Sequence, residues 1–359
     1  MNSEPSADRS SLAILAILTM VVPLFGFDLQ VSQQDTLESH GLSVLLFHNA
    51  YHSVFGDEKM SGLEIVLHEH RIATNGDVRL SPTPEQWDPI PEFKERKRGP
   101  SGNELTASCV YPGRDLSYRI EVRPEADGFR VAVQLDQPLP AALAGKAGFN
   151  LEFLPTAYFG KSFLLDDKPG IFPRHPDGPM ENDADGSAQP LPLASGHQIV
   201  LSPEDPLTRV MIASDSGPLM LFDGRNKAQN GWFVIRSLIP AGKTKDTLVW
   251  HIHPNVVQGW TRPPVVAYNQ VGYTPGRIKV AVLELDPLYD APKTARVLRL
   301  SPEGEYREVF RREIQPWGKW MRYQYARFDF SNVREPGIYA IEYAGHVNAP
   351  FRIAANVYE

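Results

Sequence analysis

Proline and glycine interrupt this chain so often that long helices are excluded. The 359 residues include 32 Pro and 27 Gly; proline breaks a helix interior and glycine weakens it. Between the interruptions lie short runs of β-prone residues, such as Phe129 to Leu135 and Lys279 to Leu285. Short strands separated by frequent turn signals predict an all-β protein. A chain of this length has room for two or three compact domains.

The most specific pattern lies between residues 265 and 358. A turn pair, Pro336-Gly337, precedes the alternating run Ile338 to Tyr343, as expected for a half-buried strand. Short strands separated by turns, without a helical period, predict a β-sandwich. Five blocks mark the region: Tyr268 to Tyr273 (YNQVGY), Phe328 to Ser331 (FDFS), Pro336 to Tyr339 (PGIY), Pro350 to Ile353 (PFRI) and Val357-Tyr358.

In this order and with these gaps, the blocks resemble the immunoglobulin-like domain that precedes the catalytic module in family 9 glycoside hydrolases. That family includes many cellulases and other β-glucan hydrolases. In it, a helical toroid downstream carries an Asp pair that positions and activates water and a Glu that acts as general acid, in an inverting reaction. The sequence ends at Glu359 without those motifs. The resemblance to a hydrolase therefore supplies no catalytic residue, and we predict that this chain alone is inactive.

Residues 37 to 262 form a second region with its own strands. Asn75-Gly76 predicts a tight hairpin, and Leu116 to Val122 with Phe129 to Leu135 predict another. A long stretch with so little helix indicates a large antiparallel two-sheet β-sandwich. Three blocks resemble the long β-sandwich extension found upstream of the immunoglobulin-like domain in some bacterial family members: Gly148 to Glu152, Phe159 to Ser162 and Gly170 to Arg174. We therefore predict a large sandwich over residues 37–262, followed by a smaller immunoglobulin-like sandwich over residues 263–359.

Residues 1–36 resemble a signal peptide or a membrane anchor. The apolar run from Leu12 to Phe27 follows Arg9 and is short for a membrane span of about 20 residues. Acidic Glu4 and Asp8 in the flank, and the lack of a clear cleavage site, leave an uncleaved anchor, a buried segment or a misassigned start as alternatives. Because polymer-degrading enzymes act outside the cytoplasm, we expect a secreted or periplasmic protein, with membrane anchoring as the alternative.

Charge argues against nucleic acid as a partner. The net charge is −7, which provides no basic footprint. The basic cluster Lys94, Arg96, Lys97 and Arg98 is interrupted by acidic residues. We interpret this cluster as a solvated loop.

Exposed tryptophans are the candidates for binding carbohydrate. Trp87 lies in a proline-rich stretch, and Trp317 and Trp320 flank Gly318-Lys319. A flat aromatic ring can stack on the C–H face of a sugar ring. Packing in a core or at a domain seam is the alternative for each.

One acidic loop has part of a calcium-binding pattern. Glu181, Asp183 and Asp185 have the one-three-five spacing of a calcium loop and are followed by Gly186, but the twelfth position is Pro192 instead of Glu. A solvated acidic loop is the alternative, and no cofactor other than calcium is predicted.

Cysteine and histidine give no stronger site. Cys109 is the single cysteine and is interpreted as a small core residue. The pairs His68 and His70, and His251 and His253, are two residues apart and would each share one face of a strand. Without an identifiable third ligand for zinc, they are interpreted as ordinary histidines.

Two hypotheses of function follow. In the first, the chain is the non-catalytic N-terminal part of a family 9 glycoside hydrolase acting on β-glucan or cellulose-type polysaccharide. Its domains would pack against and stabilise a catalytic domain, in cis or in trans, and an apolar patch on the immunoglobulin-like domain would remain uncovered here. In the second, it is a stand-alone secreted carbohydrate-binding or scaffold protein, which predicts an exposed coplanar row of aromatic rings.

Overall fold

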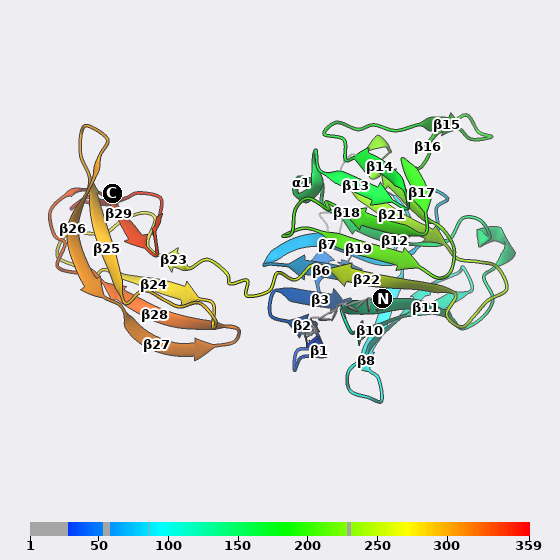
Figure 1. Ribbon diagram of the computed structural model, residues 1–359, viewed down its shortest axis with the longest axis horizontal. Helices are drawn as coiled ribbons and strands as arrows, with labels where there is room; N and C mark the ends of the chain where they lie inside the picture. The colour runs from blue at the N-terminus through cyan, green and yellow to red at the C-terminus, as the bar shows by residue number, and fades with distance from the viewer. Residues whose placement is uncertain (1–27, 53–57, 86, 228–230) are drawn as a thin grey trace, which may run out of the picture.

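The computed structural model describes residues 28–52, 58–85, 87–227 and 231–359, which form two β-rich domains joined by one extended connection (Figure 1). The prediction of an all-β protein is confirmed. The described helices are single turns: η1 (Ala141–Leu143), α1 (Pro155–Tyr158) and η2 (Gly224–Asn226). None of the described helices is long and apolar enough to cross a membrane. The apolar run from Leu12 to Phe27 lies outside the described residues.

The N-terminal domain contains two large antiparallel sheets, each with nine strands among the described residues. Sheet I consists, in spatial order, of β1 (Gln30–Val31), β2 (Leu37–Ser39), β3 (Leu42–Leu46), β6 (Leu63–Leu67), β7 (His70–Arg79), β12 (Gly148–Phe153), β21 (Phe233–Leu238), β20 (Leu219–Asp223) and β17 (Ala194–Gly196). Sheet II consists of β14 (Lys168–Ile171), β13 (Ser162–Leu165), β18 (Gln198–Leu201), β19 (Val210–Ser214), β22 (Leu248–Pro254), β11 (Gly128–Leu135), β10 (Leu116–Glu125), β9 (Leu105–Tyr111) and β8 (Glu92–Arg98). Two small hairpins, β4 (Ala50–His52) with β5 (Glu58–Met60) and β15 (Met180–Asn182) with β16 (Ala188–Pro190), lie outside these sheets. The domain therefore begins with β1, earlier in the chain than the expected boundary at residue 37.

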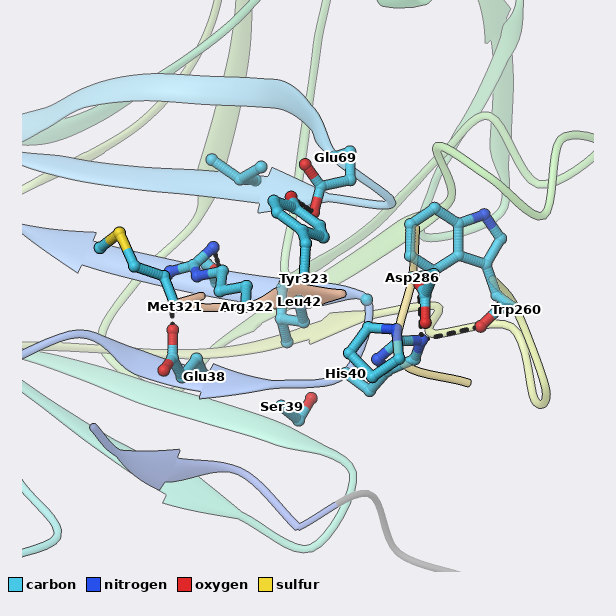
Figure 2. Close-up of a pocket in the computed structure, with 14 residues that line it drawn as sticks. Glu38, Ser39, His40, Leu42, Glu69, Trp260, Asp286, Met321, Arg322 and Tyr323 are labelled. Carbon is cyan, nitrogen blue, oxygen red and sulfur yellow. Dashed lines mark hydrogen bonds and ion pairs between the residues drawn. The ribbon is translucent and has the colours of Figure 1, made fainter. Parts of the chain in front are cut away.

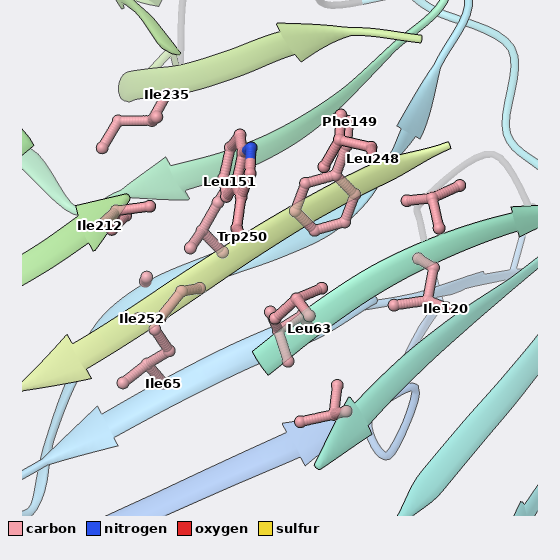
Figure 3. Close-up of a cluster of buried hydrophobic side chains, with 14 of the residues drawn as sticks. Leu63, Ile65, Ile120, Phe149, Leu151, Ile212, Ile235, Leu248, Trp250 and Ile252 are labelled. Carbon is pink, nitrogen blue, oxygen red and sulfur yellow. The ribbon is translucent and has the colours of Figure 1, made fainter. Parts of the chain in front are cut away.

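One hydrophobic core fills the space between sheets I and II (Figure 3). Trp250 of β22 is fully buried and meets Phe149 of β12 edge to face, with 5.0 Å between ring centroids. The indole Nε1 of Trp250 donates a hydrogen bond to the hydroxyl of Ser237 on β21. Cys109 is also buried, and burial raises the pKa of its thiol. Its prediction as a core residue is therefore confirmed. Burial also favours the neutral thiol over the nucleophilic thiolate.

The predicted hairpin turn at Asn75-Gly76 is wrong. Both residues lie inside β7, where a register shift opposite Leu63 marks a β-bulge. A side chain on Gly76 would place its Cβ 2.5 Å from that of Leu63, so glycine is needed for close packing. The actual turn between β6 and β7 is His68-Glu69, with φ of 49° and 67°. Positive φ at both positions gives the hairpin twist that Asn-Gly usually supplies, and His-Glu carries no such sequence signal.

The predicted solvated loop at Lys94 to Arg98 is also wrong, because these residues belong to strand β8. This strand forms the outer edge of sheet II and pairs only with β9 among the described strands. Alternating charges on an exposed edge discourage another strand from pairing there. The basic cluster is therefore explained by protection of the sheet edge.

The C-terminal domain is a smaller sandwich with its own core. Sheet III consists of β23 (Val265–Ala267), β24 (Val280–Leu285), β28 (Tyr323–Asp329) and β27 (Gln315–Trp320); sheet IV consists of β26 (Tyr306–Glu313), β25 (Thr294–Leu300), β29 (Gly337–Tyr343) and β30 (His346–Val347), with β31 (Phe351–Ile353) paired to β29. Phe328 of sheet III and Tyr339 of sheet IV are both buried in the core. The order of elements matches a large sandwich followed by a small one, as the sequence predicts.

Candidate functional site

Two of the three candidate tryptophans lie together on the C-terminal domain. Trp317 and Trp320 belong to β27, the edge strand of sheet III, and their side chains are 54% and 60% exposed. Tyr325 of the neighbouring strand β28 lies between them: its ring centroid is 6.1 Å from that of Trp317 and 6.2 Å from that of Trp320. We call these three residues the aromatic cradle.

A β-bulge brings the two tryptophans onto the same side of the sheet. In a regular strand, residues three apart point to opposite faces. Here the register shifts between Pro316 and Gly318, which inserts Trp317 as an extra residue opposite Tyr325. Gly318 has a φ of 136°, which side-chain-bearing residues rarely adopt. The bulge therefore places Trp317 and Trp320 on either side of the Tyr325 ring.

The rings enclose a shallow hollow instead of forming a flat row. The Trp317 ring is perpendicular to that of Tyr325, with an interplanar angle of 90°, and the Trp320 ring is inclined to it at 57°. The hollow has a volume of about 300 Å³ and is lined by Val282, Trp317, Trp320, Tyr325, Ala326 and Arg327. The coplanar row expected of a stand-alone carbohydrate-binding protein is absent from these three residues.

Polar groups beside the cradle are of two kinds. The Tyr325 hydroxyl donates a 2.7 Å hydrogen bond to Glu284 of β24, and this bond raises the pKa of Tyr325. Gln315 and Arg327 are paired across β27 and β28, and both are exposed. Within the described residues, neither of their side chains forms a hydrogen bond or an ion pair with another residue. The cradle thus has one fixed hydroxyl and two polar side chains that can bind a ligand.

Trp87 does not contribute to the cradle. It lies in the loop between β7 and β8 of the N-terminal domain and is 76% exposed. The structure therefore separates it from Trp317 and Trp320, and an exposed ring alone gives a ligand only one surface to contact.

The acidic loop is a hairpin turn whose carboxylates do not converge. Asp183 accepts hydrogen bonds from the backbone N–H groups of Asp185 and Ser187 and from the side-chain amide of Gln189. These bonds lower the pKa of Asp183. Glu181 precedes the turn, in β15. In the part of the chain that the structure describes, no group of three acidic, His or Cys side chains is arranged to hold a metal ion.

The prediction that each histidine pair shares one face of a strand holds for one pair and fails for the other. His251 and His253 share one side of β22, as predicted, whereas His68 lies in the β6–β7 turn and His70 begins β7. His251 contacts two carboxylates, with Nδ1 2.7 Å from Glu125 and Nε2 3.0 Å from Asp215. Burial alone would lower the pKa of His251, but these two bonds outweigh burial and raise it.

A second hollow, of about 320 Å³, lies where the two domains meet (Figure 2). Arg322, at the tip of the β27–β28 hairpin, donates a 2.7 Å hydrogen bond to Glu38 of β2. His40 lies with its Nε2 2.9 Å from the carbonyl oxygen of Trp260 and 3.3 Å from the Asp286 carboxylate. These side chains bond to one another across the hollow, so the arrangement joins the domains.

Arg262, in the connection between the two domains, and Glu69, in the β6–β7 turn, complete this junction. The Tyr323 hydroxyl donates a 2.7 Å hydrogen bond to Glu69, and the Arg262 guanidinium lies 4.6 Å from the centre of the Tyr323 ring. Arg262 also donates to Glu284, the residue that holds Tyr325. The cradle and the junction therefore share one hairpin and one carboxylate.

Sequence reasoning did not find Glu69, Arg262, Tyr323 or Tyr325. Each is an ordinary polar or aromatic residue within a short run. Their contacts join positions far apart in the chain, such as Glu69 and Tyr323, which no local pattern reveals.

The comparisons with known proteins bear on the C-terminal domain. Residues 261–348 match the family model described as the cellulase N-terminal ig-like domain, which confirms the resemblance seen in this region. No curated protein matches the chain. The resemblance of the N-terminal domain to a sandwich extension stays a prediction.

Solved structures with similarity to this chain include two from glycoside hydrolase family 9. One is a metagenome-derived family 9 endoglucanase, with 26% identity and a TM-score of 0.21 over 25% of this chain and 18% of that chain. The other is Bacteroides ovatus GH9, with 26% identity and a TM-score of 0.22 over 26% of this chain and 16% of that chain. The similarity thus spans less than a fifth of either structure.

Proposed function

We propose that this chain is the non-catalytic N-terminal part of a family 9 glycoside hydrolase that acts on β-glucan or cellulose-type polysaccharide. In this proposal, the C-terminal domain packs against a catalytic helical toroid and stabilises it, in cis or in trans. The observation that carries the proposal is the match of residues 261–348 to the cellulase N-terminal ig-like domain.

An exposed apolar surface on the C-terminal domain supports a further protein contact. Val271, Ile278 and Tyr358 are 60%, 80% and 67% exposed. The Tyr358 hydroxyl lies 3.2 Å from the carbonyl oxygen of Gly272, and Ile278 precedes the start of β24. Val280, just after Ile278, pairs with Asp329 at the end of β28 away from Tyr323, and the chain that leaves β23 toward Val271 runs to the same end. Arg322 and Tyr323, at the other end of β28, contact the N-terminal domain. We call Val271, Ile278 and Tyr358 the apolar end; exposed apolar surface of this kind marks protein–protein contacts.

The proposal places the protein outside the cytoplasm, because the polymer it would act on cannot enter the cell. The apolar run from Leu12 to Phe27 supports export. Determining the N-terminal residue of the protein recovered from the medium, the periplasm and the membrane fraction tests this placement. Recovery of the full-length chain from the cytoplasm alone would contradict it.

The test of the proposal begins with the coding DNA. Reading past the codon for Glu359, and through the neighbouring genes, is expected to reveal a family 9 catalytic module with its paired aspartates and late glutamate. The absence of such a module from both places would overturn the proposal and favour a stand-alone carbohydrate-binding protein.

The apolar end is then tested by titration calorimetry with that module produced separately. We expect the Val271→Asp/Ile278→Asp double variant to bind the module at least about tenfold more weakly, or about 1.4 kcal/mol. Leu207→Asp is a matched control, because Leu207 is 45% exposed but lies in the N-terminal domain. Unchanged affinity of the double variant would exclude the apolar end as the contact surface.

A further inference from the structure

We propose that the aromatic cradle binds one pyranose unit of a neutral β-linked glucan. The choice of a glucan as ligand rests on the proposed function. The existence of a sugar site rests on the geometry of Trp317, Trp320 and Tyr325.

The two indole rings of the cradle are exposed. Trp317 and Trp320 remain more than half exposed, although the core of the same domain lies directly beneath sheet III. Burial of a large aromatic side chain is strongly favourable. A ligand that covers the two indole rings of this edge strand would therefore bind with a favourable free energy from their burial.

The hollow has a shape that fits a sugar ring. Two aliphatic side chains, three aromatic rings and Arg327 surround a hollow of about 300 Å³, at the lower end of the range for small-molecule sites, about 300 to 1,000 Å³. Because the Trp317 ring is perpendicular to the Tyr325 ring, the hollow has both a wall and a floor. A pyranose has an apolar C–H face and a polar rim, and it can stack on one ring while its edge contacts the other.

Two polar side chains beside the hollow can bind sugar hydroxyls. Arg327 has only hydrogen-bond donors, whereas the Gln315 amide has donors and an acceptor. Sugar hydroxyls both donate and accept, so these two exposed side chains together match them. Neither is engaged elsewhere in the described part of the chain.

A hydrogen-bond chain and the β-bulge hold the cradle in place. The Tyr325 ring is fixed by its bond to Glu284, which in turn is bonded to Arg262. The bulge at Trp317 and Gly318 fixes the strand that carries the indoles. A site held in its binding conformation loses less entropy when a ligand binds.

A protein partner suits the cradle less well. A stable protein interface buries at least about 1,200 Å² in total, whereas the cradle is a small hollow on one edge of sheet III. The apolar end, formed by Val271, Ile278 and Tyr358, is at a different part of the domain. Occupation of the apolar end therefore does not require contact with the cradle.

In the experiment, the full chain is titrated with cellohexaose. Binding is measured by calorimetry and by the quenching of tryptophan fluorescence. We expect saturable binding to the wild type. Trp317→Ala and Trp320→Ala should each weaken binding at least about tenfold, which corresponds to about 1.4 kcal/mol, and the double variant should abolish it. Trp87→Ala is the control, because it removes an even more exposed indole ring outside the cradle, and it should bind as the wild type does.

A second pair of variants separates cradle geometry from stability. Gly318→Ala strains the backbone at a φ of 136° and should turn Trp317 away from Tyr325, so binding should be lost. Gly304→Ala strains the β25–β26 turn, where φ is 86°, and a Cβ at either glycine meets no neighbouring atom. Gly304→Ala should lower stability comparably and leave binding intact.

Three results would overturn the proposal. They are no saturable cellohexaose binding by the wild type, equal losses of cellohexaose affinity in Trp87→Ala and Trp317→Ala, or wild-type affinity in the Trp317→Ala/Trp320→Ala double variant. If the wild type binds no glucan, and the Trp317→Ala/Trp320→Ala double variant no longer binds the catalytic module, the cradle is instead assigned to a protein contact. Because the sugar titration contains no catalytic module, its failure is distinguishable from failure of the proposed function.

Discussion

Strand β22 of the N-terminal domain and strand β27 of the C-terminal domain use tryptophan in opposite ways. In the N-terminal domain, Trp250 lies between two sheets, fully buried, with its Nε1 bonded to Ser237. In the C-terminal domain, Trp317 and Trp320 lie on an edge strand with more than half of each side chain exposed. The first arrangement stabilises the fold, whereas the second leaves large apolar rings in contact with water. The difference indicates that Trp250 contributes to a core, whereas Trp317 and Trp320 offer a surface that a ligand can cover.

This comparison extends to the polar residues. Glu64 of β6 is completely buried and accepts hydrogen bonds from Asn49, Ser61 and Thr74. By contrast, Arg327 and Gln315 beside the cradle have no partner among the described residues. Satisfied buried groups specify a core, while unsatisfied exposed groups are available to a ligand.

The largest expected effect comes from removing the buried ring. Trp250→Ala should lower the free energy of unfolding by about 3 to 5 kcal/mol, because it leaves a large cavity opposite Phe149. Urea denaturation measures this change. Trp87→Ala should change stability by less than about 0.5 kcal/mol, and similar losses in the two variants would break the comparison.

Loss of the buried carboxylate ranks second. Glu64→Ala should cost about 3 kcal/mol, because it leaves the buried hydroxyls of Ser61 and Thr74 and the partly buried Asn49 amide without their acceptor. Thermal unfolding of this variant is compared with that of Glu95→Ala, whose carboxylate is about half exposed and pairs with Lys97. A Glu64→Ala protein as stable as Glu95→Ala would show that water replaces the carboxylate.

The domain junction should show a smaller effect. Tyr323→Phe removes the hydrogen bond to Glu69 and should weaken the contact between the domains by about 1 kcal/mol. The expected result is a broader distribution of domain separations in small-angle X-ray scattering, with little change in the unfolding of either domain. Tyr306→Phe, on the exposed strand β26, is the control. Identical scattering of the two variants would mean that other contacts set the domain orientation.

The smallest predicted effect depends on pH. Because the pKa of His251 is raised above its ordinary value of 6.5, the imidazolium stabilises the folded state below pH 6.5. This contribution is lost as the pH rises through the folded-state pKa. The stability advantage of the wild type over His251→Gln should be at most about 1 kcal/mol at pH 5 and should vanish by about pH 8. An advantage that grows with pH would contradict the assigned contacts with Glu125 and Asp215.

Local sequence signals were enough to predict the fold class and the hairpin of β10 and β11. They failed where backbone conformation depends on packing. Asn75-Gly76 has the composition of a turn, but close contact with Leu63 makes it a bulge, while His68-Glu69 turns without any usual turn residue. Tertiary contacts thus determine which of several possible sites turns the chain.

The candidate site was predictable only in part. The exposure of Trp317 and Trp320 could be inferred from the intervening Gly318-Lys319. Their convergence on Tyr325 could not, because it depends on a one-residue register shift between β27 and β28. The junction through Arg262 and Glu69 depends on the relative placement of two domains, which no periodicity records.

The most direct test of the account is the release of reducing sugar from β-glucan by three samples: this chain, the family 9 catalytic module encoded in the same gene or nearby, and their mixture, each assayed after heating for increasing times. We predict no release by the chain alone and a longer active half-life of the module in the mixture. Reproducible hydrolysis by the purified chain, or a half-life of the module unchanged by it, would contradict a non-catalytic stabilising role.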